Sequence, residues 1–305
     1  MAFRVKGKDG TVQSAVRRIA CEQIDAALAA VDGQDDGDVV HDVRKRCKKL
    51  RGLVRLVRPS FPGYARENAA FRDIAGLISA ARDARVMQDT YDALVEHFHA
   101  EVDRRALGSI RRRFTLQRKG ELADDGSERA LPQVRARLLE ARERAAAWRL
   151  DDDGWAAVSG GLEKTYRQAR KAAAAARANP HDEAFHELRK HVKYHWSHCL
   201  LLEGLWRPML VVRQDAALSL SELLGDHHDL SVFAHRLDTD PLAYGRPGDV
   251  VAAIGLARRR QAELEAKAWP LAGRLLAQSP EQLGDHFGAL WKVWRSAARA
   301  PAEAA

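Results

Sequence analysis

Apolar side chains recur every three or four residues along most of the chain, which is the spacing of one face of an α-helix. The pattern breaks at turn-forming runs such as GQDDGD, DDDG and TDPLAYGRPGD. We therefore predict an all-α fold. Helices are expected over 11–31, 39–57, 62–80, 83–117, 133–149, 155–178, 182–205, 208–225, 229–237, 248–277 and 281–297. The polar run KGELADDGSERALP, over 119–132, predicts a linker.

Two basic helical stretches repeat each other in the two halves of the chain. HDVRKRCKK begins at His41 and HELRKHVKY begins at His186, and a histidine, an arginine and two lysines recur in register. RDARV, from Arg82, and HDLSV, from His228, follow them at nearly the same separation. This pattern predicts an internal duplication within one domain spanning 1–305. Its parts are a first half-repeat over 11–118, the linker 119–132, a bridging helix over 133–149 and a second half-repeat over 155–297.

Each repeated stretch carries its cations on one helical face and its apolar residues on the other. The apolar side has Val43, Cys47, Leu50, Val54 and Val57 in the first copy, and Leu188, Val192 and Cys199 in the second. The cationic stripes are His41, Arg44, Lys45, Lys48, Arg51 and Arg55, then His186, Arg189, Lys190 and Lys193, with a third stripe of Lys164, Arg167 and Lys171 beside Arg170. Like charges at this spacing repel one another, and a solvated face normally carries acids that relieve the repulsion. Only Asp42 does so in the first stripe. A single stripe fits a solvated face, whereas three favour a cationic binding surface.

The overall charge agrees with an anionic partner without selecting one. The formal net charge is +8 and the isoelectric point is about 9.6, which favours nucleic acid, phosphate polymers or anionic lipid. The three cysteines, Cys21, Cys47 and Cys199, fit a reducing compartment. The chain shows neither a signal peptide nor an apolar run that could cross a membrane, so we expect a cytoplasmic protein with no membrane partner.

The repeated pattern H-x-x-R-K-x-x-K resembles the CHAD family, an α-helical domain named for its conserved histidines. The runs GLEKTYRQARKA, AFHELRKHVKYHW and LLGDHHDLSVF resemble its second half, and ARDARV resembles the matching element of its first half. The likeness extends from about 11 to 297. It implies two helical bundles related by pseudo-two-fold symmetry, with the basic stripes facing a shared cleft. Nothing in the chain resembles the triphosphate-tunnel (CYTH) domain that many relatives carry.

The resemblance also implies binding of inorganic polyphosphate and association with polyphosphate granules. The family's binding positions correspond to His41, Arg44, Lys45 and Lys48, and to His186, Arg189, Lys190 and Lys193. The second copy departs from the first where Trp196 stands in place of Arg51, which shortens its stripe. A polyanion would raise the pKa of His41 and His186, so tighter binding is expected at pH 6 than at pH 8.

Three other functions compete with this interpretation. His191, His195 and His198 have a spacing that can hold a metal, although His195 projects toward the core face. His41–Asp42 and His228–Asp229 are similar to the histidine–aspartate pairs of metal-dependent phosphohydrolases, but Asp229 is expected to cap a helix. No P-loop or nucleophile elbow is present, so we expect neither an enzyme nor a cofactor.

The strongest alternative is a nucleic-acid-binding helical protein. Against it, the basic helices lack Asn and Gln for base readout and aromatic residues placed for base stacking. Trp196, Trp206 and Tyr194 are expected in the core. The arginine-rich run RRALGSIRRR, over 104–113, would suit a scaffold that recruits other proteins, although a solvated face explains it equally well.

Overall fold

The chain folds entirely into helices over the part that a computed structural model describes, which confirms the predicted all-α class. That part covers residues 3–33, 38–78, 80–102, 107–123 and 126–299; for 80–85, 121–123, 126–128 and 299 it gives the backbone alone. The helices are α1 (Val12–Val31), α2 (Val39–Leu56), α3 (Tyr64–Gly76), α4 (Ala80–His97), α5 (Gly108–Ala123), α6 (Gly126–Ala146), α7 (Gly154–Ala178), α8 (Asp182–Leu201), α9 (Arg207–Thr239), α10 (Pro247–Leu275) and α11 (Pro280–Arg299). None of the helices in these ranges is both long and apolar enough to cross a membrane.

Three of the predicted boundaries are wrong. The long helix expected over 83–117 is two helices, because α5 folds back along α4 and the Tyr91 hydroxyl donates to the Leu107 carbonyl oxygen at 3.0 Å. The linker expected over 119–132 is helical over 119–123 and 126–132. The helices expected over 208–225 and 229–237 are one continuous helix, α9, in which Gly225 is an interior residue.

Side-chain caps fix where the helices of the two repeated motifs begin. The Asp38 carboxylate accepts a hydrogen bond from the His41 backbone N–H at 3.0 Å, which satisfies one of the free donors at the start of α2. At the start of α8, His181 Nδ1 accepts from the Ala184 N–H at 3.3 Å. Acidic residues in the first turns, Asp42 in α2 and Asp182 and Glu183 in α8, lie where the helix dipole favours negative charge. The motifs therefore start at defined positions.

Two hydrophobic cores hold the helices together, and each core combines helices from both halves of the sequence. The larger one contains the apolar faces of α1, α2, α3, α6, α7 and α8, with parts of α9, α10 and α11. The smaller one joins α4 and α5 to the C-terminal half of α9 and to α10. The predicted half-repeats therefore do not form separate cores, and the internal duplication remains a prediction from the sequence.

The two motif helices approach closely because glycine lies at their contacts. A Cβ on Gly52 of α2 would overlap the Ser197 side chain of α8, and a Cβ on Gly161 of α7 would overlap the backbone carbonyl of Leu56. The His198 Nε2 of α8 lies 3.2 Å from the Gly52 carbonyl oxygen. These contacts pack α2 directly against α7 and α8.

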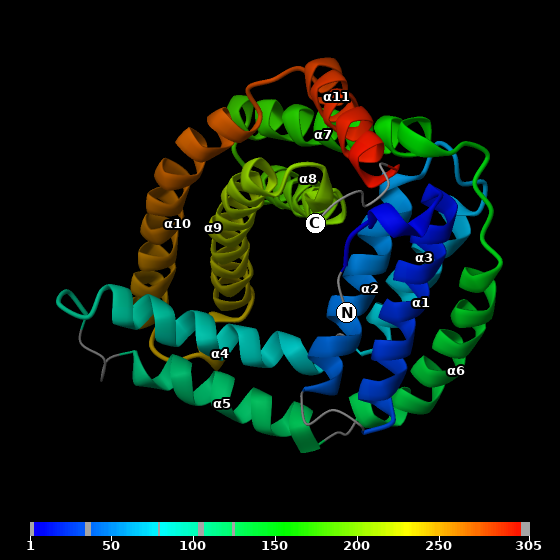
Figure 1. Cartoon of the computed structure of the whole chain (residues 1–305). Helices are drawn as coiled ribbons and strands as arrows, with labels where there is room; N and C mark the ends of the chain where they lie inside the picture. The colour runs from blue at the N-terminus through cyan, green and yellow to red at the C-terminus, as the bar shows by residue number, and fades with distance from the viewer. Residues whose placement is uncertain (1–2, 34–37, 79, 103–106, 124–125, 300–305) are drawn as a thin grey trace, which may run out of the picture.

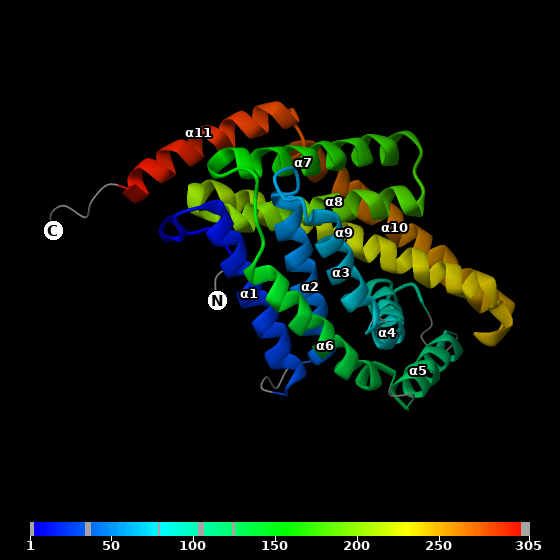
Figure 2. The ribbon, with the colours of Figure 1, turned by 90° about the vertical axis from the view of Figure 1, so that its right-hand side faces the viewer.

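Four helices surround the centre of the view in Figure 1: α8, α9, α4 and α2. Within this set α8 packs along α9, α9 contacts α4, and α2 contacts α8. α10 lies outside α9, whereas α7 and α11 lie on the outer side of α8, as the turned view in Figure 2 also shows. The fold thus places the two motif helices side by side and packs one of them, α8, along α9.

Candidate functional site: a basic surface on α2, α8 and α9

The arginines of the first stripe lie in the groove between α2 and α3. Each donates a hydrogen bond to a neutral group of α3, so none of these three bonds cancels the positive charge. The bonds run from Arg44 Nη1 to the Ala75 carbonyl oxygen (3.2 Å), from Arg51 Nε to Asn68 Oδ1 (3.4 Å) and from Arg55 Nη1 to the Tyr64 hydroxyl (3.0 Å). The apolar side of the same helix is fully buried, as predicted.

The rest of the first stripe lies nearer to solvent. His41 and Lys48 are exposed, and Lys45 is half exposed beside Asp42, whose carboxylate lies 3.8 Å from its Nζ. This Asp42–Lys45 pair is the relief of charge that the sequence suggested. Lys48 lies one turn before Gly52, the residue at which α2 touches α8.

Tyr194 of α8 joins the two stripes. The Arg55 guanidinium lies 4.1 Å from the centre of the Tyr194 ring, and the Arg51 guanidinium lies 6.0 Å from it. Such cation–π contacts hold an arginine in place and leave its charge uncompensated. The prediction that Tyr194 is a core residue is therefore wrong, because its ring is only partly buried and supports the arginines of α2.

Arg58, which follows α2 directly, adds a cation that sequence reasoning missed. Its Nε and Nη2 atoms are buried, and in the described part of the chain they have no hydrogen-bond acceptor. Burial lowers the pKa of Arg58, and the Tyr64 hydroxyl only partly offsets this. The positive charges of Arg55 and Arg58 also extend to α8, where both help lower the pKa of His191.

The open face of α8 continues the positive charge toward α9. Lys190 pairs with Glu187 of the same helix. Lys193 is partly buried, with its Nζ 4.1 Å from the centre of the Trp196 ring. Burial lowers the pKa of Lys193, the nearby Arg189 lowers it further, and Glu222 of α9 opposes both. Trp196 is partly buried under Lys193, in line with the shorter second stripe.

Arg189 lies across α9 at Gly225. A Cβ at Gly225 would come within 3.2 Å of the Arg189 Nε, so the missing side chain makes room for the guanidinium. The Nε atom is buried and has no acceptor among the described residues. Beside it, the ring of His186 lies 4.7 Å from that of His228 of α9, measured between centroids. We call the following set the basic surface: Lys48, Arg51, Arg55, Arg58, His186, Arg189, Lys190, Lys193 and His228.

In the third predicted stripe, on α7, the two arginines face α10 and α11. Arg167 forms ion pairs with Glu281 of α11 at 2.8 Å and with Glu163 at 3.9 Å. Arg170 donates to the Gln278 carbonyl oxygen at 2.6 Å and lines a separate groove of about 200 Å³ between α7 and α10. Lys164 and Lys171 are exposed on α7. The spacing on α7 identified a basic face correctly, but that face adjoins α10 and α11.

The three histidines proposed as metal ligands point in different directions. His195 is buried on the core side, as predicted, and its Nε2 accepts a hydrogen bond from Arg213 Nε at 2.9 Å. His198 is buried against the Gly52 carbonyl, and His191 lies beside Glu187. Among the residues that the structure describes, no three His, Cys, Asp or Glu side chains cluster as a metal site would require.

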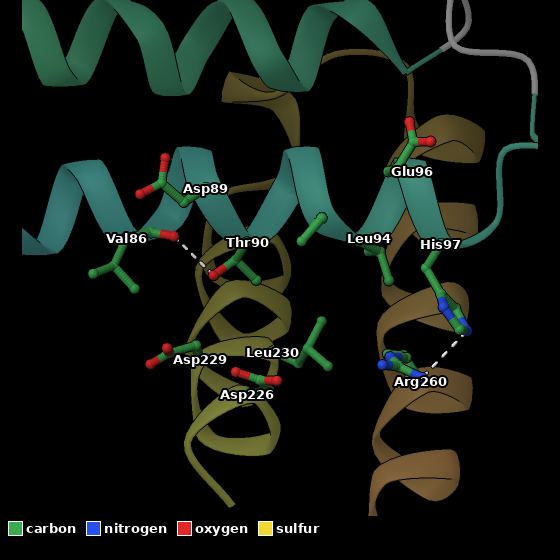
Figure 3. Close-up of a pocket in the computed structure, with 11 residues that line it drawn as sticks. Val86, Asp89, Thr90, Leu94, Glu96, His97, Asp226, Asp229, Leu230 and Arg260 are labelled. Carbon is green, nitrogen blue, oxygen red and sulfur yellow. Dashed lines mark hydrogen bonds between the residues drawn. The ribbon is translucent and has the colours of Figure 1, made fainter. Parts of the chain in front are cut away.

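A pocket of about 610 Å³ between α4, α9 and α10 has the opposite charge (Figure 3). Its lining includes Asp226 and Asp229 of α9 and Asp89 of α4, and Arg260 lies at the α10 side near His97. Asp229 therefore does not cap a helix, because it lies inside the continuous α9. Burial raises the pKa of Asp226, as do Asp229 and Glu222, while Arg260 and Arg189 oppose the shift. The basic surface thus ends where these acids begin.

Two predicted features lie partly or wholly outside the described residues. In RDARV, the proposed counterpart of HDLSV, the side chains of 82–85 are not described. The same holds for 104–106 of the arginine-rich run. Within the rest of that run, Arg111 forms a two-pronged ion pair with Asp92, with 2.7 and 3.0 Å bonds, as a solvated face would.

Comparisons with known proteins agree with the resemblance found in the sequence. Two uncharacterized proteins of Mycobacterium tuberculosis, MT2285 of strain CDC 1551 and Rv2226 of strain H37Rv, are each 30% identical to this chain over 268 residues. The match covers 82% of this chain and 50% of each relative, so the chain spans about half the length of these curated relatives. The sequence model of the CHAD domain matches residues 18–238. The chain therefore belongs to the CHAD domain family.

Proposed function

We propose that the basic surface binds inorganic polyphosphate, as a binding module and not as an enzyme, and that it brings the protein to polyphosphate granules. The observation that carries the proposal is the set of cations that runs from α2 to α8 and ends at Arg189, against Gly225 of α9. At three of them, Arg55, Arg58 and Arg189, buried Nε atoms have no acceptor within the described part of the chain. A bound anion would supply those acceptors, which is the usual way to compensate a buried cationic group.

The chemistry of the surface suits a phosphate polymer. Polyphosphate carries about one negative charge per phosphate, so arginine can bind successive units with paired N–H groups and lysine can add point charges. A guanidinium stays protonated at neutral pH and does not act as a general base, so these residues suit neutralisation and not bond cleavage.

The aromatic residues favour polyphosphate over nucleic acid, the second candidate. Base stacking needs a free aromatic face. Arg55 covers the Tyr194 ring, and Lys193 covers the Trp196 ring. Both contacts leave charge where phosphate would bind and occupy the surface on which a base would stack.

The test is a competition between long polyphosphate and duplex DNA and RNA of matched charge, measured across a salt series. We expect a preference for polyphosphate at about 0.15 M salt, and an affinity that falls steeply as salt rises because binding releases counterions. Lys48→Glu and Lys193→Glu should each weaken binding at least tenfold. Arg167→Glu should weaken it less, because Arg167 is paired with Glu281 on another face.

Arg112→Glu, on the exposed face of α5, is the matched control for the change in net charge. The proposal would be refuted if all three polymers bind equally, lose affinity together as salt rises, and are weakened by Arg112→Glu as much as by the two lysine variants. Nucleic acid would then be the better candidate. An assay of phosphate release from polyphosphate with divalent metal present tests the non-enzymatic part, which steady release would contradict.

A further inference from the structure

Two histidines from different helices form a pair at the α9 edge of the basic surface. The ring centroids of His186 and His228 lie 4.7 Å apart and the ring planes are inclined by 50°. The Nδ1 atoms of both rings are buried, and neither has a hydrogen-bond partner among the described residues. Two imidazoles in contact, each with an unused nitrogen, form a site that can gain a proton without breaking a hydrogen bond made by that nitrogen.

The charged groups around the pair oppose protonation in the free protein. Burial lowers the pKa of His228 most, and His186, Arg189 and His227 lower it further, while Asp182 opposes the shift. The neighbouring His227 turns away, with its Nε2 3.0 Å from the Glu265 carboxylate of α10. On α8, Glu187 pairs with Lys190. On α9, Asp226 carries the next carboxyl group, at the pocket shared with Asp89 of α4. The pair thus lies next to Arg189, while of the surrounding carboxylates Glu187 is paired with Lys190 and Asp182 and Asp226 are exposed.

We infer that His186 and His228 form a proton-linked phosphate site, so that binding of polyphosphate takes up a proton here. This inference rests on the proposed function. A phosphate beside the pair favours its charged form, and a protonated imidazole becomes a donor at both ring nitrogens. The protonated pair would then donate a hydrogen bond to the bound phosphate. The negative charge of the same phosphate would cancel the repulsion from Arg189.

This assignment differs from the one that the sequence suggested. His41 and His186 are equivalent in the repeat, but His41 is exposed in the first turn of α2, whereas His186 is partly buried against His228. His228 was not among the predicted binding residues, because in the motif HDLSV only the aspartate was given a structural role, as a helix cap. Only the fold brings His228 of α9 against His186 of α8.

The experiment is titration calorimetry of the full chain with long polyphosphate in two buffers of different ionisation enthalpy. The difference between the two measured heats counts the protons taken up, independently of affinity. Long polymer is needed because its titratable terminal phosphates are then few. We expect uptake of about one proton per bound site near pH 6.5. As pH falls, the affinity should rise by up to about tenfold per pH unit for each proton taken up.

Variants assign the proton to its residue. His228→Asn and His186→Asn should each remove at least half of the uptake and flatten the pH dependence of affinity. His286→Asn, an exposed histidine of α11, is the matched control and should leave the uptake unchanged. Asp226→Asn tests a carboxyl group of α9 whose pKa is raised, because its titration would produce the same sign.

The outcomes separate this inference from the proposed function. Binding without proton uptake overturns the inference and leaves polyphosphate binding intact. The same conclusion follows if the uptake survives both histidine variants but disappears in Asp226→Asn. Absence of binding at every pH overturns both. Uptake lost in His228→Asn and kept in His286→Asn supports the pair.

Discussion

The buried histidines of α8 predict that the free protein loses stability steeply in mild acid. His195 and His198 are fully buried, and the side chain of His191 is 11% exposed. Burial lowers the pKa of His191 to about 4 and that of His198 to about 3. It lowers the pKa of His195 well below its usual value, and the adjacent Arg213 lowers it further. All three are therefore neutral in the folded chain across the physiological range.

The size of the effect follows from proton linkage. An unfolded histidine titrates near pH 6.5, so below that pH the unfolded chain binds protons that the folded chain does not, and folding becomes less favourable as pH falls. Each such histidine costs about 1.4 kcal/mol per pH unit, so three cost about 4 kcal/mol per unit. Because an unfolded histidine is only half protonated at pH 6.5, the loss between pH 6.5 and 5 is about 5 kcal/mol, a large part of the 5–15 kcal/mol that is typical of folded domains. Glu163 and Asp226, whose pKa burial raises, contribute with the opposite sign at lower pH.

The assay is the urea dependence of helicity at several pH values between 5.0 and 7.5, without polyanion. The free energy of unfolding should rise with pH at a slope of about three protons. His198→Gln can keep a donor for the Gly52 carbonyl, so it should reduce the slope by about a third whatever it does to absolute stability. His286→Gln should leave the slope unchanged. A wild-type slope below one proton between pH 6.5 and 5 would refute the reasoning.

Two further predictions concern glycines that the packing requires. Gly161→Ala should lower the free energy of unfolding by roughly 1–3 kcal/mol or more in a urea titration, because its methyl group would meet the backbone of Leu56. Gly255→Ala, at an open position of α10, should raise the free energy of unfolding by up to about 1 kcal/mol. Equal effects of the two substitutions would contradict the packing argument. Gly225→Ala should leave the fold intact and weaken polyphosphate binding several-fold in the competition assay, because its methyl group would shift the flexible guanidinium of Arg189. An unchanged affinity would show that the position of the Arg189 guanidinium does not matter for polyphosphate binding.

The helices could be predicted from the sequence because each has a regular apolar face, but three of their ends could not. Gly225 looks like a helix end because glycine is a poor helix former, yet α9 continues through it and the gap in its surface holds Arg189. The run over 119–132 looks like a linker because it is polar, although its Glu, Leu, Ala and Arg residues are good helix formers. The turn before α5 depends on contacts of Phe98 and Leu107 in the smaller core, which are set by tertiary packing.

The candidate site was predictable where one helix carries it and unpredictable where several meet. The spacing of the stripes on α2 and α8 identifies their cations, because a helical face is a local property. Tyr194, Arg58 and His228 were not predicted as site residues, because each acts through a neighbouring helix. Tyr194 lies under Arg55, the charge of Arg58 acts on His191, and His228 lies against His186. The same holds for the partners of Arg167 and Arg170 on α7. No spacing within α7 reveals that Arg167 faces Glu281.

Opposite faces of α8 respond to acid in opposite ways, and the proposed ligand connects them. As pH falls, the buried face of α8 destabilises the free protein, whereas the pair of His186 and His228 on the open face binds polyphosphate more tightly. A ligand that binds only the folded chain stabilises it by an amount that grows with its concentration relative to the dissociation constant. In addition, a bound polyanion would offset Lys190, Arg55 and Arg58, the cations that help lower the pKa of His191. The stability of the protein saturated with polyphosphate should therefore fall less steeply between pH 6.5 and 5 than that of the free protein. Parallel slopes in the two urea series would mean that the two faces of α8 titrate independently of the ligand.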